Sequence, residues 1–164
     1  MSRLIAVVPF AFAIVPLIVF AEDLKLPPLQ KQPTPQAVIN EHFEALNKCD
    51  WSRIMAQYPA DYQLFLPGGA VVKGREKAGE IFAGFVKPHD QGGLCGLTFT
   101  PEQTFTVGET LNIQWRAEAP FLAEPYRGAD AYETHDGLMA AMVSTFKAAD
   151  MKLKEVATGS STPR

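Results

Sequence analysis

Apolar and polar residues alternate through the second half of the chain, and this alternation predicts β-strands. Residues 111–118, LNIQWRAE, alternate without a break, which is typical of a strand with one buried face. One long strand is predicted over residues 97–107, with its apolar side formed by Leu97, Phe99, Phe105 and Val107. Pro101 within it favours a position at the edge of a sheet or a bulge.

Residues 126–146 predict a hairpin, because Asp136-Gly137 suits a two-residue turn with positive φ angles. Such a turn pairs His135 with Leu138. The resulting register puts two sets of side chains on one face that looks into a core or pocket: Asp130, Tyr132 and Thr134, with Met139, Ala141 and Val143. The opposite, outer face would then carry Leu138, Met142 and Phe146, which are too apolar to face water alone.

The first half of the chain has helical periodicity. Thr34 is a suitable N-cap and Pro35 suits the first turn, so a helix is predicted from Pro35 to about Lys48. Its apolar arc contains Val38, Ile39, Phe43, Ala45 and Leu46, and His42 falls inside this arc.

Two further helices and a short hairpin complete the first half. Asp50 would cap a helix over 51–58, and strands are expected at 62–66 and 70–73. A third helix is predicted over 75–86, with these side chains inward: Ala78, Ile81, Phe82 and Phe85. Helices followed by antiparallel strands indicate an α+β fold. We expect three N-terminal helices packed in a strongly curved, mostly antiparallel sheet, a cone whose open mouth would be a ligand site.

The chain ends predict export and flexible flanks. Residues 1–21 contain Arg3, a long apolar run and small residues near Ala21, as in a secretory signal peptide; the alternative is a retained membrane anchor. We expect a periplasmic or secreted protein cleaved near Ala21, a Pro-rich leader at 22–33, one domain at 34–150 and a flexible tail at 151–164. Removing Arg3 from the 15 basic side chains leaves 14 against 18 acidic ones, without a basic cluster that would bind nucleic acid.

The two cysteines, Cys49 and Cys95, leave two alternatives open. In an exported protein they could form a disulfide that closes a long loop. They could equally be two separate, small buried thiols, and the sequence slightly favours this second alternative because a domain of this size does not need a disulfide.

Three sequence segments, quoted next as phrases, and one predicted strand resemble the nuclear transport factor 2-like superfamily, which includes ketosteroid isomerases and SnoaL-type polyketide cyclases. The phrases are VINEHFEALNKCDWSRIMAQY, DYQLFLPGGAVVKGREKAGEIFAGF and GADAYETHDGLMAAMVSTF, and the strand is TLNIQWRAEA. They cover about residues 35–147. The resemblance implies the cone fold and, because relatives often dimerise through the outer sheet face, a homodimer.

The ketosteroid isomerase pattern implies roles for two residues. His42 stands where that family has a helix-1 tyrosine that donates to the substrate oxyanion. Asp130, in Asp130-Ala131-Tyr132, stands where it has a protonated aspartic acid, a case that is a standard example of a carboxyl group kept neutral by its site. The family's aspartate base should fall near Leu66, where there is no carboxylate, so steroid isomerisation of the familiar kind is in doubt.

The candidate catalytic residues are therefore His42 and Asp130. Burial would raise the pKa of Asp130 and let it donate to a carbonyl group; the alternative is an aspartate bonded to backbone amides or to an arginine. His42 would be a donor or general base, or else a core histidine bonded to a backbone carbonyl. Four aromatic side chains could line a pocket for a flat apolar ligand, or could simply be core: Tyr58, Phe82, Trp115 and Tyr132.

No cofactor or metal is expected, because the sequence lacks paired-Cys or HExxH spacing, a glycine-rich phosphate loop and a nucleophile elbow. The favoured interpretation is an exported domain that binds a small apolar or aromatic carbonyl compound. The sequence leaves open whether it is an enzyme; if so, cofactor-independent proton transfer of isomerase, cyclase or lyase type is expected. The alternative is a non-catalytic periplasmic ligand-binding or dimeric scaffold module of the same fold.

Overall fold

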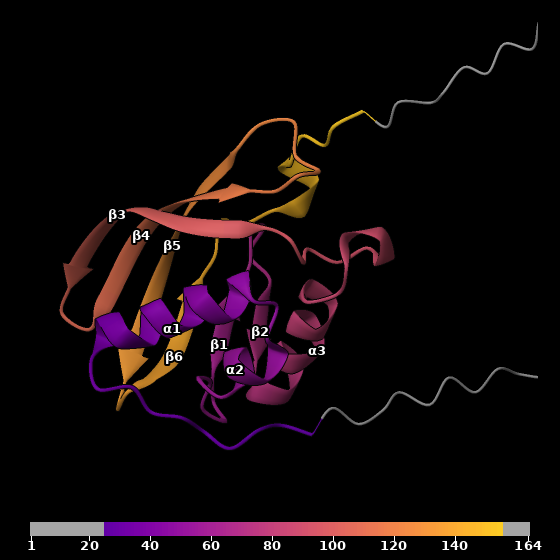
Figure 1. Ribbon diagram of the computed structural model, residues 1–164. Coiled ribbons are helices and arrows are strands. Elements are labelled where there is room, and N and C mark those ends of the chain that lie inside the picture. The colour runs from indigo at the N-terminus through magenta and orange to yellow at the C-terminus, as the bar shows by residue number, and fades with distance from the viewer. Residues whose placement is uncertain (1–24, 156–164) are drawn as a thin grey trace, which may run out of the picture.

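The protein folds as three helices packed against one face of a curved six-stranded sheet (Figure 1). The computed structural model describes residues 25–155, so the predicted signal peptide and the end of the predicted tail lie outside the described residues. The helices are α1 (Pro35–Asn47), α2 (Trp51–Met55) and α3 (Arg75–Phe85). The strands are β1 (Gln63–Phe65), β2 (Val71–Lys73), β3 (Thr98–Val107), β4 (Thr110–Glu118), β5 (Tyr126–His135) and β6 (Leu138–Val143).

The sheet has the order β2-β1-β6-β5-β4-β3. Among the strands of this sheet, β1 pairs with β6 in parallel and the other neighbouring strands pair antiparallel. In Figure 1, α1 runs across the sheet, and α2 and α3 lie beside the short strands β1 and β2. The predicted α+β cone is confirmed.

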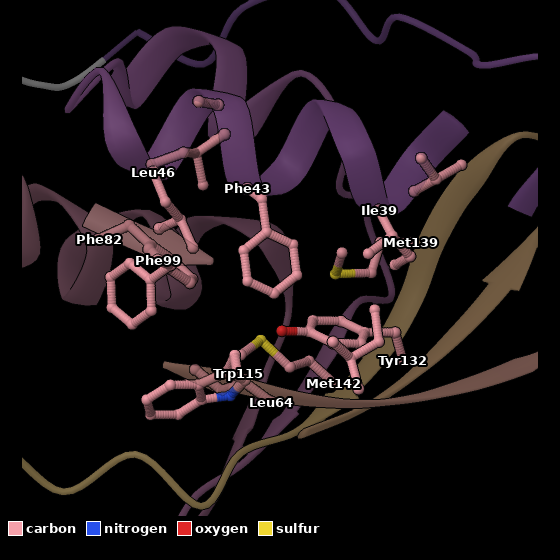
Figure 2. Packing of buried hydrophobic residues seen from close by; sticks show 14 of the residues in the cluster. Ile39, Phe43, Leu46, Leu64, Phe82, Phe99, Trp115, Tyr132, Met139 and Met142 are labelled. Atoms are coloured by element: carbon pink, nitrogen blue, oxygen red, sulfur yellow. The ribbon is translucent and has the colours of Figure 1, made fainter. Parts of the chain in front are cut away.

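Helix α1 follows its sequence pattern closely. The Thr34 hydroxyl accepts a hydrogen bond from the Ala37 amide and Pro35 occupies the first turn, so the helix begins where predicted. All five predicted apolar positions and His42 are buried. Figure 2 shows Ile39, Phe43 and Leu46 pointing from this helix toward the sheet.

Strand β3 lies at the edge of the sheet and has a bulge next to Pro101, as predicted. The side chains after Pro101 do not lie as predicted. The register with β4 shifts between Pro101 and Gln103, so one residue bulges out of the ladder. A one-residue shift exchanges the two faces of a strand. Phe99 therefore points into the core, whereas Phe105 and Val107 are 67% and 59% exposed, contrary to the prediction of a single apolar side.

The β5–β6 hairpin turns at Asp136-Gly137, both with positive φ, and pairs His135 with Leu138 as predicted. A second shift, between Glu133 and Thr134, was not predicted, and it places Met142 rather than Ala141 opposite the inward Tyr132.

This second shift corrects the predicted faces of the hairpin. Val143 is 48% exposed and Ala141 is half-buried, whereas Met139 and Met142 are buried. Of the three residues assigned to an apolar outer face, Met142 lies in the core and Phe146 packs half-buried against it, whereas Leu138 is buried but is not part of the core cluster.

Helices α2 and α3 depart from prediction in smaller ways. Helix α2 ends at Met55, three residues earlier than expected, and tighter turns continue to Tyr58. In α3, Ile81 is 39% exposed rather than inward. Its place on the buried side is taken by Gly79, whose carbonyl oxygen accepts a hydrogen bond from the indole of Trp51.

Cys49 and Cys95 form a disulfide, so the slight preference for two separate thiols was wrong. The bridge joins the end of α1 to the loop before β3. The Asn47 side chain reinforces this junction, because it donates to the Phe99 carbonyl oxygen (3.0 Å) and accepts from the Phe99 amide (2.7 Å). A disulfide and a pair of hydrogen bonds thus hold the C-terminal end of α1 against the start of β3.

The described flanks lie against the domain. In the leader, the Gln30 amide donates to the Ala56 carbonyl oxygen and the Gln32 amide to that of Gly137. The guanidinium of Arg75 donates to the carbonyl oxygens of Pro27 and Met55. After β6, Leu153 pairs with Leu122 in an isolated bridge. Within residues 25–155, no helix has the length and apolar character needed to cross a bilayer.

Candidate ligand-binding site

Asp130 lies on the inner face of β5 and is 6% exposed. Its carboxylate accepts hydrogen bonds from the Thr145 amide at Oδ1 (2.7 Å) and from the Tyr132 hydroxyl at Oδ2 (3.3 Å). The indole N–H of Trp115 faces the same carboxyl group without completing a hydrogen bond. The backbone-amide alternative from the sequence is therefore present, together with a phenol partner, and no arginine bonds to Asp130 among the described residues.

Burial raises the pKa of the Asp130 carboxyl group above its usual value. The Thr145 amide and the side chains of Trp115, Ser144 and Tyr132 oppose this rise, because they favour the ionised form, but they do not cancel it. A carboxyl group with a raised pKa keeps its proton at higher pH than an exposed aspartate and can then donate a hydrogen bond.

His42 is completely buried on the inner side of α1. Its Nδ1 lies 3.3 Å from the Tyr58 hydroxyl, and its Nε2 has no hydrogen-bond partner. Burial lowers the pKa of His42 to about 3, so the imidazole is neutral at physiological pH. Proton uptake by this side chain would place an unsolvated charge in the core.

His42 and Asp130 are connected through tyrosines rather than directly. The His42 ring packs edge-on against Tyr132, with ring centroids 5.7 Å apart, and Tyr132 donates to Asp130. Tyr58, the partner of His42, stacks on Tyr62 with centroids 4.0 Å apart. Burial raises the pKa of all three phenols, so they remain protonated.

A cavity of about 90 Å³ lies between α3 and the sheet, close to the end of α1. Its wall is mostly apolar, and the polar side chains in it are Asp130 and Ser144. The lining residues are Leu46, Leu64, Leu66, Ile81, Phe82, Phe85, Phe99, Asp130, Met142, Ser144 and Phe146. Because Ile81 is 39% exposed, the rim of the cavity reaches the surface.

Of the six predicted site residues, only Asp130 and Phe82 line this cavity. His42, Tyr58, Trp115 and Tyr132 are at most 1% exposed and pack in the filled part of the core. In Figure 2, Phe82 and Phe99 lie together at one end of the core cluster, and Tyr132 and Met139 lie at the other.

Sequence reasoning missed Ser144. The one-residue shift in the hairpin hid it, because the uninterrupted register gives no reason to place it beside Asp130. The sequence signal for the site was the alternation along β5, which places Asp130 and Tyr132 on the same inward face. This signal identified the residue from β5 but not the one that follows β6.

A larger hollow, of about 530 Å³, lies on the outer face of the sheet. It is a saddle between β3, β4, β5 and β6, and its outward side chains include Phe105, Asn112, Ala131 and Val143. Its lining also includes Asp130, whereas His42 does not line it. Within residues 25–155, no group of three or more His, Cys, Asp or Glu side chains is arranged to hold a metal ion.

The architecture of three helices on a curved six-stranded sheet is that of the nuclear transport factor 2-like proteins. The model of the SnoaL-like domain matches residues 39–152, and the chain belongs to this family. No curated protein sequence matches the chain.

Solved structures of similar fold have low sequence identity. One is the protein RV0760c from Mycobacterium tuberculosis, with 18% identity, a TM-score of 0.59, and coverage of 76% of this chain and 100% of that one. Another is SalBIII, an epoxide hydrolase/cyclase-like enzyme in pyran ring formation, with 16% identity, a TM-score of 0.59 and coverage of 73% and 95%. A third is a candidate ketosteroid isomerase from Kribbella flavida, with 18% identity, a TM-score of 0.55 and coverage of 74% and 78%.

Proposed function

We propose that this SnoaL-like domain binds a small apolar molecule that carries one carbonyl group. The observation that carries the proposal is the position of Asp130, a buried carboxyl group with a raised pKa in the wall of an otherwise apolar cavity. A neutral carboxyl group donates a hydrogen bond to a carbonyl oxygen, and the apolar wall accommodates the rest of the ligand.

The cavity volume limits the ligand. An engineered apolar cavity of about 150 Å³ accepts benzene, which has six non-hydrogen atoms, so a space of about 90 Å³ encloses roughly three or four, and a five-membered ring must reach into the rim. A larger ligand would have to extend through the rim beside Ile81. A steroid nucleus is too large to be enclosed.

Cyclopentanone is a suitable probe, and its binding can be followed by NMR through the Thr145 and Phe146 amides. We expect affinity to fall as pH rises through the raised pKa of Asp130, because the ionised carboxylate cannot donate. Asp130→Asn should still bind but lose the pH dependence, since the side-chain amide donates at every pH. Absence of binding by the wild-type protein, or affinity that increases with pH, contradicts the proposal.

Proton-transfer catalysis is the second candidate function, favoured by the position of Asp130 as a proton donor in the cavity. His42 would act in it as a positioning residue, because its ring contacts Tyr132 but does not line the cavity. In this reaction Asp130 would donate to the carbonyl oxygen and solvent water at the rim would accept the α-proton. Exchange of the α-protons of cyclopentanone for deuterium, catalysed by the wild-type protein and lost in Asp130→Leu, would support catalysis. Exchange at the solvent rate leaves the binding function alone.

We further propose that the chain is exported. The Cys49–Cys95 disulfide supports this location, because structural disulfides persist in oxidising compartments. N-terminal sequencing of the protein from a fractionated host should begin near Glu22 in the periplasmic or secreted fraction. Recovery of an uncleaved chain with the membranes would instead favour a retained anchor.

A further inference from the structure

Ser144 is the second polar side chain in the cavity wall. It follows the last residue of β6 and is 8% exposed. Its amide donates to the Phe65 carbonyl oxygen (2.9 Å), which fixes the backbone beside β1. The following residue, Thr145, donates its amide to Asp130, so the two cavity polar groups belong to one hydrogen-bonded unit.

The Ser144 hydroxyl has one partner that defines its direction. Its oxygen accepts a hydrogen bond from the Phe146 amide (3.0 Å). A hydroxyl group that accepts in this way still has its own proton to donate. The Ser144 side chain also lies close enough to the Asp130 carboxyl group to favour its ionised form, which lowers the pKa of that group.

We propose that Ser144 determines specificity by supplying a second hydrogen bond to the ligand's carbonyl oxygen, beside the one from the Asp130 carboxyl group. A carbonyl oxygen has two lone pairs and accepts two donors. The remaining lining side chains of the cavity are apolar, so a ligand with its own polar hydrogens gains no further side-chain partner there. The favoured class is a small ketone, aldehyde or ester.

This inference rests on the proposed function and differs from the expectation from the sequence, in which the second donor was His42. The imidazole Nε2 is buried in the filled core and does not reach the cavity, whereas Ser144 lines it. The second donor therefore comes from the end of β6 rather than from α1.

The test compares two probes of the same shape, cyclopentanone and methylenecyclopentane, which lacks the oxygen. We expect Ser144→Ala to weaken cyclopentanone binding about threefold to tenfold, the range for one neutral hydrogen bond. Methylenecyclopentane binding should change less than about twofold on the same reasoning. Ser144→Thr keeps the hydroxyl and should keep the wild-type ratio of the two affinities, even if its extra methyl group weakens both.

Ser52→Ala, at an exposed position on α2, is the matched control and should alter neither affinity. Equal weakening of both probes by Ser144→Ala would assign Ser144 a structural role through the Phe146 amide and overturn the inference. Unchanged cyclopentanone binding would overturn it as well, while leaving the Asp130 site intact. Failure of the wild-type protein to bind cyclopentanone would overturn the proposed function and this inference with it.

Discussion

Buried polar groups have different surroundings in the two halves of the interior. In the filled half, between α1 and β5, His42 packs against Phe43, Tyr58 and Tyr132 without lining the described cavity, and its Nε2 has no partner among the described residues. In the half under α3, Asp130 and Ser144 face free space. An unpartnered polar atom in a filled core costs stability, whereas a polar atom beside a cavity can bind a guest. Burial alone therefore does not identify a functional residue; adjacent space does.

The largest expected effect concerns His42 in the filled half. Its pKa is lowered to about 3, so folding excludes a proton that the unfolded chain takes up below pH 6.5. The stability that neutral His42 provides is complete above pH 6.5 and is lost as the pH falls toward 3. At about 1.4 kcal/mol per pH unit, the free energy of unfolding should fall by roughly 5 kcal/mol over this range.

Urea unfolding at several pH values measures this loss. Asp130 acts in the opposite direction, because its raised pKa means that its contribution is lost as the pH rises. The comparison with His42→Gln isolates the histidine: this variant should lose much less stability between pH 6.5 and 3. His135→Gln, at an exposed imidazole, is the control and should follow the wild type. Equal acid sensitivity of wild type and His42→Gln would contradict the assignment.

The second-largest expected effect concerns the disulfide, whose removal should affect the two halves of the interior differently. The bridge closes a loop with a sequence separation of 46. Replacing both cysteines by serine should lower the free energy of unfolding by ~4 kcal/mol, the loop-entropy value for such a length. Hydrogen exchange should accelerate most at residues 86–99, where Phe99 forms part of the cavity wall. A uniform acceleration that includes the amides around His42 would show that the two halves do not open separately.

A smaller effect is expected from Gly128, which lies where the two halves meet. A Cβ atom there would lie 2.4 Å from the Trp115 ring and 2.8 Å from the Thr145 hydroxyl. Gly128→Ala should therefore cost about 1–3 kcal/mol and weaken the Thr145 hydrogen bond to Asp130. Gly84→Ala, on α3 with open space around it, should instead be neutral or stabilising by up to about 1 kcal/mol. Thermal unfolding of both variants makes the comparison.

The smallest effect on stability concerns the outer sheet face. The homodimer expected from the sequence stays a prediction, but the residues proposed to form it are now Phe105 and Val143 beside Ala129 and Ala131. Phe105→Glu should change stability by less than about 0.5 kcal/mol. It should convert a dimer into a monomer in sedimentation velocity. A wild-type protein that sediments as a monomer at every concentration would remove the prediction.

The sequence predicted the elements and their order because capping and periodicity are local. Thr34 and Pro35 define where α1 begins, and the alternation along β4 correctly assigns its buried face. A site inside the cone was predicted, but its full set of lining residues was not, because two one-residue shifts, in β3 and in the hairpin, change which side chains share a face. Asp130 was identified because it precedes both the shift and the turn, whereas Ser144 follows them.

The side chain of Asn47 forms the two backbone hydrogen bonds with Phe99 that a neighbouring strand would form. It satisfies both the amide and the carbonyl of Phe99, which β4 does not use because they point away from the sheet. Two residues further along, Pro101 has no N–H to offer on the same side. The first part of this edge strand therefore cannot pair with a strand of another molecule. This protects the exposed edge of the sheet from edge-to-edge aggregation.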